Sequence, residues 1–191
     1  MKAIDIIHNE HRALAAVLQA LRVVMDEIRT EGRAPDFPLL AALIDYITQV
    51  PEKLHHPKED NYLFACLRQR NAADLIPLLD RLQAQHRDGA MLICELQSAL
   101  IHFLALGEPA FAAFDEQVRR YREFTWEHLR AEETELLPQA RRILTAEDWA
   151  TIDAAFEANR EPWSGPTGEY QTLFSRIVNM VPPPYGVGPA Q

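Results

Sequence analysis

The chain has 191 residues, 48% of them hydrophobic and 25% charged, which is typical of a globular protein with one sizeable core. Its net charge of −9 argues against nucleic acid or an anionic membrane surface as the main partner. The N-terminus lacks a secretory signal pattern, no uninterrupted apolar run approaches twenty residues, and two cysteines make no disulfide framework, so we expect a cytoplasmic protein without a membrane span.

Apolar residues recur every three or four positions over most of the chain, which predicts an all-α protein. In chain order the predicted helices are about 4–31, 38–70, 74–106, 109–144, 145–159 and 170–180, with a loop at 162–168 and a Pro-rich tail from 181 onward. Pro51 and Pro57 are expected to kink or split the second helix. Four long helices with short turns predict an up-down-up-down four-helix bundle over residues 1–144, with residues 145–191 as a helical extension and tail packed on it.

Histidine and glutamate form a pattern that occurs twice. A lone histidine on an apolar helical stripe is followed, about forty residues later, by a His-x-x-x-Glu pair. The first copy is His11 with His55 and Glu59, and the second is His86 with His128 and Glu132. Both members of the pair recur after the same step along the chain, and the lone histidine recurs after a step that is only slightly longer.

The rise of an α-helix indicates that the two copies meet. Each lone histidine lies about 30 Å before the end of its helix, and each paired histidine lies about 26–28 Å after the start of the next helix. Antiparallel packing therefore returns all of them to one level of the bundle. A carboxylate buried there costs several kcal/mol unless it is paired or bound to a metal, so two carboxylates beside four imidazoles predict a two-metal site.

The ligand types narrow the choice of metal. Mixed imidazole and carboxylate ligation points to iron or manganese. The ferritin-like centre uses four glutamates with Glu-x-x-His, and the zinc hydrolase motif His-Glu-x-x-His is absent, so a histidine-rich di-iron centre fits best, with manganese or zinc as substitutes. The alternative is that the histidines are packing residues and the His-x-x-x-Glu pairs are solvated. The matching spacing of the two copies argues against it.

The motifs resemble those of the haemerythrin-like family, also called the HHE cation-binding domain. The resemblance rests on NEHRAL around His11, HHPKEDNYLF at 55–64, QAQHRDG around His86 and HLRAEETELLP at 128–138, and it covers about residues 1–144. It implies a four-helix bundle around a non-haem di-iron site, oxo- or hydroxo-bridged and spanned by two carboxylates. The implied metal ligands are His11, His55, Glu59, His86, His128 and Glu132.

One position departs from the family pattern. Oxygen-carrying haemerythrins have a second histidine one turn after the one on the third helix, and this chain has Ala90 there. The second metal is therefore expected to keep an open or water-filled position. His56 is a candidate substitute, although a regular helix turns it about a hundred degrees away from His55, which favours an outer or surface position. The local kink leaves open whether Asp60 also points inward.

Further side chains are candidates for hydrogen bonding around the metals, with plain packing or exposure as the alternative for each. They lie close to a predicted ligand or on the same helical stripe: His8, Tyr62, Tyr121 and Glu135. His102 is far along its helix and is expected to be structural or exposed. Cys66 and Cys94 are expected to be buried thiols without activating neighbours.

Three functions are consistent with this pattern. The leading hypothesis is a di-iron protein that binds or responds to oxygen, nitric oxide or peroxide, with a role in sensing, storage or iron and redox homeostasis. The second is a di-iron enzyme of the peroxidase, nitric-oxide-handling or iron–sulfur-repair type, which a substrate pocket or a dedicated cysteine would favour. The third is a metal-free helical interaction protein. Neither nucleic acid nor a membrane is expected as a partner, and a homodimer is allowed.

Overall fold

The computed structural model describes residues 1–70, 73–158, 169–181 and 183, and it contains no strand in these ranges, which confirms the all-helical fold class there. The helices are α1 (Lys2–Glu31), α2 (Phe37–Gln49), α3 (His56–Lys58), α4 (Ala65–Gln69), α5 (Ile76–Leu106), α6 (Glu108–Ala131), α7 (Leu137–Ile143), α8 (Ala146–Ala158) and α9 (Glu169–Met180). Between them lie the π-helical turns η1 (Pro51–His55), η2 (Glu59–Phe64) and η4 (Glu132–Leu136) and the 3-10 turn η3 (Ala73–Leu75). The predicted loop 162–168 and most of the predicted tail lie outside the described residues.

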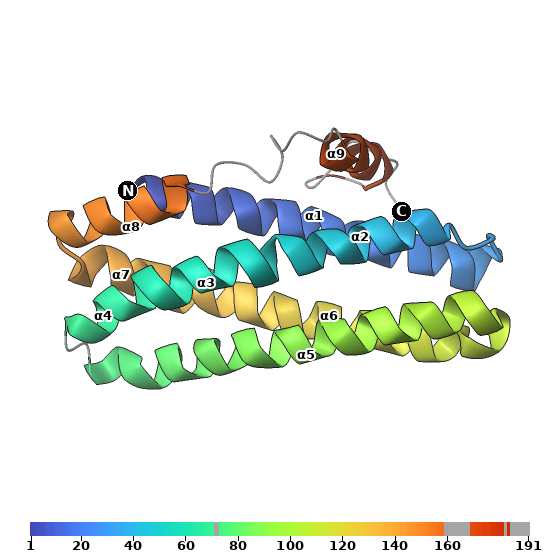
Figure 1. The fold of residues 1–191 in the computed structure, drawn as a ribbon, viewed down its shortest axis with the longest axis horizontal. Helices are drawn as coiled ribbons and strands as arrows, with labels where there is room; N and C mark the ends of the chain where they lie inside the picture. Colours follow the sequence, from blue (N-terminus) through green and yellow to red (C-terminus); the bar gives the residue numbers. More distant parts are fainter. Residues whose placement is uncertain (71–72, 159–168, 182, 184–191) are drawn as a thin grey trace.

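The long helices run alongside one another as columns (Figure 1). One column is α1, the next runs from α2 through α4, the third is α5, and the fourth runs from α6 into α7. Helix α5 packs against α6 and α2, and α1 packs against α2 and α6. Helix α8 packs on α1 near the start of the chain, while α9 contacts α1 and α2. The columns therefore share an interior to which each of them contributes side chains.

The turns between columns have clear local causes. Helix α1 ends at Gly32, whose φ of 64° is the left-handed conformation that glycine adopts most readily. Helix α2 begins with the side chain of Asp36 accepting a hydrogen bond from the backbone N–H of Leu39 at 2.9 Å. Gly107, with a φ of 66°, separates α5 from α6. These short reversals bring neighbouring columns into antiparallel contact.

Two apolar clusters fill the interior at opposite ends of the columns. One contains Tyr46 and Phe114 and joins α1, α2, α5, α6 and α9. The other contains Phe64 and Phe156 and joins the first residues of α1 to η2, α4, α5, α7 and α8. His11 lies in α1 between residues of the two clusters. Polar side chains at the level of His11 therefore have apolar residues on both sides along the helix axes.

The prolines of the second column produce π-helical turns. In η1 the backbone N–H of His55 donates to the carbonyl oxygen of Val50, five residues earlier, at 3.0 Å. The turns η2 and η4 begin at Glu59 and Glu132, the two glutamates of the repeated pattern. A π-helical turn adds a residue to the helical repeat and so changes which side chains face inward. The predicted kink or break at Pro51 and Pro57 thus takes the form of π-helical turns, and the interruption at η4 was not predicted from the sequence.

Candidate metal centre

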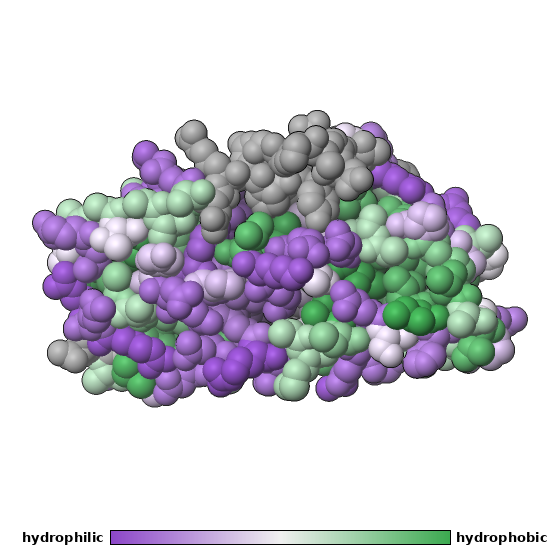
Figure 2. Space-filling view, viewed as in Figure 1, coloured by the Kyte–Doolittle hydropathy of each residue, from purple (hydrophilic) through white to green (hydrophobic). Residues whose placement is uncertain are grey.

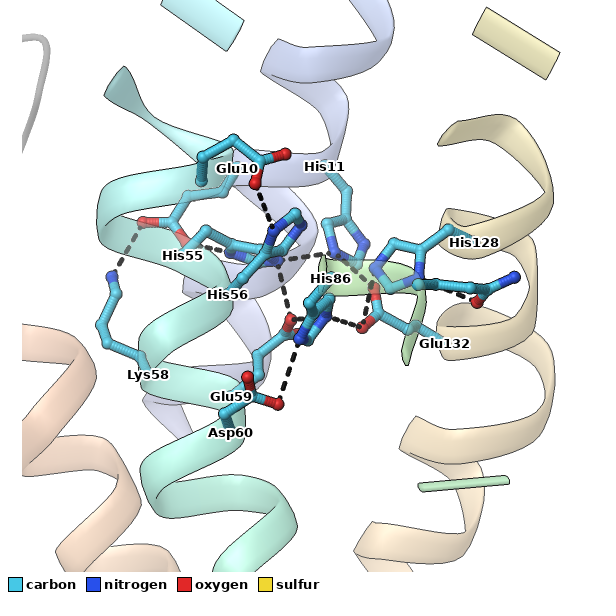
Figure 3. Close-up of polar contacts among 12 residues, drawn as sticks. Glu10, His11, His55, His56, Lys58, Glu59, Asp60, His86, His128 and Glu132 are labelled. Atoms are coloured by element: carbon cyan, nitrogen blue, oxygen red, sulfur yellow. Dashed lines mark hydrogen bonds and ion pairs between the residues drawn. The ribbon is translucent and has the colours of Figure 1, made fainter. Parts of the chain in front are cut away.

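The structure brings all six predicted ligands together in the layer between the two apolar clusters (Figure 3). They form two groups whose ligand atoms lie within 4.8 Å of one another. Both groups contain Glu59 and Glu132, which are 0% exposed. The first group adds His11 and His55, and the second adds His86 and His128. The two carboxylates are thus positioned to be shared by two cations.

Distances within the layer fit ligands that surround a common ion. The Nε2 atom of His55 lies 3.3 Å from a carboxylate oxygen of Glu59, and that of His11 lies 3.3 Å from Glu132. In the second group, His128 Nε2 is 3.4 Å from Glu132, and His86 Nε2 is 3.6 Å from Glu59. Two ligand atoms that each lie about 2.1 Å from one ion are about 3 Å apart at a right angle. The observed separations are slightly wider than this value.

Buried polar atoms without partners give an independent test of the fit. Within the described residues, both carboxylate oxygens of Glu59 and of Glu132 are buried without a hydrogen-bond partner. The same holds for the Nε2 atoms of His86 and His128. Leaving a buried charged group unsatisfied costs more than about 1–3 kcal/mol each. Cations in this layer would satisfy all of these atoms, so the residues fit a two-metal site.

The four histidines of the two groups are each held from behind through Nδ1. This nitrogen faces an acceptor in every case, which leaves Nε2 directed into the layer (Figure 3). The partners are Glu133 for His11 at 2.7 Å, Glu10 for His55 at 2.6 Å, Asp60 for His86 at 3.1 Å and Gln85 for His128 at 3.1 Å. Metal-binding histidines commonly donate their other N–H to such an acceptor, which fixes the tautomer and the ring orientation.

These outer acceptors repeat along the chain in step with the ligands themselves. Glu10 and Gln85 directly precede His11 and His86, the lone histidines of the two copies. Asp60 and Glu133 directly follow the two glutamates of the pairs. Sequence reasoning had named Asp60 but missed the other three, although the same repeat could have found them. The predicted candidate His8 belongs to this outer set, since its Nε2 lies 3.0 Å from Glu133.

Helix α8, in the C-terminal part of the chain, contacts the surroundings of the site through the buried side chain of Lys58. Lys58 Nζ lies 3.2 Å from Glu10 and 4.8 Å from the centroid of the Phe156 ring of α8. Burial alone would raise the pKa of Glu10, but His55 and Lys58 lower it overall. Helix α8 therefore covers a lysine that supports the acceptor of a predicted ligand.

His56 lies against the site, so the expectation of a surface position is wrong, while its role as ligand or outer residue stays a prediction. Its ring stacks on that of His86, with centroids 4.2 Å apart and an interplanar angle of 11°. Its ligand atom lies within 4.8 Å of those of His86 and His128. The carboxylate of Glu52 lies 3.7 Å from its Nδ1. The expectation assumed a regular helix, whereas the π-helical turn η1 ends immediately before His56.

The place of Ala90 also differs from the expectation. Ala90 is exposed on the outside of α5, and the buried residue of that turn is Gly89. A Cβ atom at Gly89 would lie 3.3 Å from Glu52 Oε1 and 3.4 Å from the ring of Phe124. The space next to α5 is thus occupied by Glu52, which lies behind His56.

The remaining candidates divide into exposed and buried residues. Tyr62 is 41% exposed, and Glu135 is exposed and pairs with Arg81 at 3.2 Å, so neither contacts the site. Each lies in a π-helical turn, which rotates it off the stripe expected from regular helix geometry. Tyr121 is buried, and its pKa is raised by burial and by the charge of Glu52. The predicted burial of the thiols is wrong for Cys94, which is exposed, and Cys66 is only partly buried.

The imidazoles differ in their pKa values because their neighbours differ. Burial lowers the pKa of each, but Glu59 and Glu10 raise that of His55 to about 10. Asp60 and Glu132 likewise overcome burial and raise the pKa of His86 to about 9. His128 has a neutral amide as its outer acceptor, and burial lowers its pKa to about 3. Before a cation binds, protons on His55 and His86 therefore balance the buried carboxylates.

Metal loading is expected to release protons for this reason. An imidazole must lose its proton before its Nε2 can bind a metal. With pKa values of about 10 and 9, His55 and His86 carry protons at pH 7, so the apparent affinity for Mn²⁺ or Zn²⁺ should rise between pH 6 and about 9. Calorimetric titrations in buffers of different ionisation enthalpy measure the number released. A pH-independent affinity with no proton release would contradict the assigned charge states.

Comparison with known proteins agrees with the motifs and the geometry. The family described as the hemerythrin HHE cation binding domain matches residues 2–140. "Uncharacterized protein Mb2018" of Mycobacterium bovis (strain ATCC BAA-935 / AF2122/97) and "Uncharacterized protein MT2051" of Mycobacterium tuberculosis (strain CDC 1551 / Oshkosh) are each 23% identical over 172 residues. The match covers 90% of this chain, which spans 66% of the length of each relative. No solved structure matches the chain significantly. Because the family match covers most of the residues, the chain belongs to the hemerythrin HHE cation-binding domain family.

Proposed function

We propose that this protein is a non-haem di-iron protein that binds or responds to oxygen, nitric oxide or peroxide, on an up-down-up-down four-helix bundle. The observation that carries the proposal is the sharing of Glu59 and Glu132 by two groups of ligand atoms. Two fully buried carboxylates without hydrogen-bond partners in the described part of the chain are costly unless metal cations or protonated imidazoles lie beside them. Mixed imidazole and carboxylate ligation favours iron, with manganese or zinc as substitutes.

The residues of the layer have distinct tasks in this proposal. The first cation would be held by His11 and His55, and the second by His86, His128 and His56, with both glutamates common to the two. Bound iron supplies one-electron redox chemistry and a coordination position for a small ligand. The chain itself orients the imidazoles through Glu133, Glu10, Asp60 and Gln85, and the apolar clusters on either side exclude water.

A groove between α1 and α6 supports access by small molecules from the side of His11. Its volume is about 650 Å³, and its lining includes His11 and Glu133 together with Ala15 and Leu129. A cavity of this size is in the range of small-molecule sites. The groove also favours the second candidate function, a di-iron enzyme of the peroxidase, nitric-oxide-handling or iron–sulfur-repair type.

We propose the cytoplasm as the location of the protein. The two free cysteines suit a reducing compartment of this kind.

Iron content tests the proposal. Protein purified without a histidine tag and reconstituted anaerobically with Fe²⁺ is expected to bind about two irons per chain. Metal analysis after desalting measures this ratio. A content below about half an iron per chain, with manganese and zinc equally low, would leave the third hypothesis, a metal-free helical interaction protein.

Rapid mixing separates a binding protein from an enzyme. The reduced, loaded protein is mixed anaerobically with oxygen, nitric oxide or hydrogen peroxide in separate experiments. Reversible spectral changes with one ligand favour binding or sensing, whereas repeated consumption of excess peroxide or nitric oxide favours an enzyme. Ala15→Trp, which fills the groove, should slow the reaction while the iron content stays at two. Unchanged rates in this variant would exclude the groove as the entry route.

A further inference from the structure

The second half of α5 is apolar on the side that faces away from the bundle. By length and composition alone, the segment Ala73–Leu106 could cross a membrane, yet only 28% of its most apolar window is buried in the described structure. Met91, Ile101, Leu104 and Leu106 are each at least 60% exposed. Figure 2 shows hydrophobic residues gathered toward the end of the bundle at which the chain turns from α5 into α6. Scattered exposed apolar residues are ordinary, but a concentration on one helix marks an interaction surface.

Five exposed residues of this segment lie along one line of the helix. Met91, Cys94, Ser98, Ile101 and Ala105 follow three- and four-residue steps and are all exposed; we call them the outer stripe of α5. The buried residues of the same segment, which include Leu92, Leu96 and Phe103, lie on the opposite side. Helix α5 thus has an inner face that contacts the core and an outer face from which Met91 and Ile101 project, with Glu95, Ser98 and His102 also exposed. Packing within one chain accounts for the inner face.

A groove of small side chains runs beside the outer stripe. It lies between α5 and α6, has a volume of about 490 Å³, and is lined in part by Ser98, Ala99, Ala110 and Ala113. Small residues on a helix pair allow large side chains of another helix to enter between the ridges. The outer stripe supplies such side chains in Met91 and Ile101. One surface therefore carries both the projecting residues and the groove that receives them, which an interface between identical copies requires.

The charges of this surface also favour a second copy. Although the chain has a net charge of −9, Glu95 is the only Asp, Glu, Lys or Arg between Asp88 and Glu108. Its carboxylate lies 2.8 Å from Arg120 of α6, so it is already paired. Two copies that meet here bring no unpaired like charges together. A lipid bilayer is a poorer occupant, because Arg119 and Arg120 of the adjacent helix α6 are exposed.

We propose that two copies of this chain form a symmetric dimer through the outer stripe of α5 and the α5–α6 groove. Met91 and Ile101 of each copy enter the groove of the other, and α5 packs against its counterpart. The outer stripe from Met91 to Ala105 is about 21 Å long, which allows two contacting helices to pack side by side. The dimer contact does not reach the metal layer, since the outer stripe begins at Met91 and His86 is buried.

Sedimentation velocity on the full chain tests the proposal. The natural protein is expected to be a dimer at 10 µM, and Ile101→Glu is expected to weaken dimerisation at least about 100-fold, because it places a charge in each copy's apolar contact. Tyr62→Glu is the matched control, because it adds the same charge at an exposed hydrophobic residue outside the stripe. This variant should leave the dimer intact. Circular dichroism and iron content, expected to be unchanged in both variants, separate loss of the dimer from loss of the fold or of the metal site.

A distance measurement gives a second test. With Cys66 replaced by serine, a spin label on the exposed Cys94 reports on the centre of the stripe. Contacting helices have axes about 8–10 Å apart, so pulsed electron paramagnetic resonance should show a short, narrow label-to-label distance that disappears in Ile101→Glu. A natural protein that is monomeric at 100 µM, a dimer that survives Ile101→Glu, or a monomer that floats with phosphatidylcholine vesicles would each overturn the proposal, the last in favour of a membrane.

Discussion

Glu132→Ala is expected to reduce the iron content from about two per chain to well below one. The Glu132 carboxylate belongs to both groups of ligand atoms, with His11 and His128 at 3.3 and 3.4 Å, so its loss removes a ligand from each cation. The rise in melting temperature on metal loading should disappear with the metal, because a cation stabilises the fold only to the extent that it binds the native state. Metal analysis and calorimetry with and without iron measure the two effects.

Glu135→Ala is the matched control, since it removes the same side chain three residues away. Glu135 is exposed and pairs with Arg81, and such an exposed pair is worth about 0–1 kcal/mol. This variant should keep about two irons per chain. The same is expected of His102→Ala, which changes a residue of the α5–α6 groove. Equal loss of iron in Glu132→Ala and Glu135→Ala would mean that the π-helical turn does not orient the two glutamates as described.

His56→Ala is expected to lower the iron content from about two to about one per chain. His56 stands beside His86 and His128 but is absent from the group that contains His11 and His55, so only the second cation loses a ligand. Its removal also leaves the buried carboxylate of Glu52 without the neighbouring imidazole. Metal analysis after dialysis at graded chelator concentrations should show one tightly held and one weakly held iron.

The control for this variant is His8→Ala, which removes an imidazole that contacts Glu133 and no ligand group. It should retain both irons, with at most a modest loss of affinity at the first position. Retention of two equally tight irons in His56→Ala would show that His56 is a packing residue, and the second cation would then depend on the six ligands alone.

The two proposed cation positions differ chemically despite the repeated pattern. The first has two acidic outer acceptors, Glu10 and Glu133. The second has Asp60 and the neutral Gln85, together with the additional imidazole of His56. Negative outer acceptors increase the basicity of the imidazoles that they contact. We therefore expect the first position to bind a cation more tightly than the second.

The helices and the meeting of the six candidate ligands were predictable because both depend on regular helix geometry. Apolar periodicity marks each helix, and the rise per residue places the two copies of the pattern at one level. The inward position of His56 was not predictable in this way. A π-helical turn inserts a residue without changing the local composition, so the sequence gives little sign of where the inward face changes. The same turns explain why Tyr62 and Glu135 face outward.

The expectation that Ala90 faces the metals is wrong for a related reason, while the open position on the second metal stays a prediction. The comparison with oxygen carriers assumed that the residue one turn after His86 faces the metals, whereas the buried residue there is Gly89. Tertiary contacts decide this, since Glu52 and Phe124 occupy the space beside Gly89. By contrast, the outer acceptors Glu10, Gln85 and Glu133 were within reach of the sequence, because they repeat in step with the ligands. Extending the search for repeats to the neighbours of each ligand would have identified them.

An anomalous difference map at the iron absorption edge, from crystals of the iron-loaded protein, tests the two-metal site most directly. We predict two peaks in the layer between Glu59 and Glu132, about 3.5–4 Å apart, which is the separation of ions that share bridging ligands. The first should lie beside His11 and His55, and the second beside His86, His128 and His56. A single peak in this layer, or peaks elsewhere in a protein with full iron content, would contradict it.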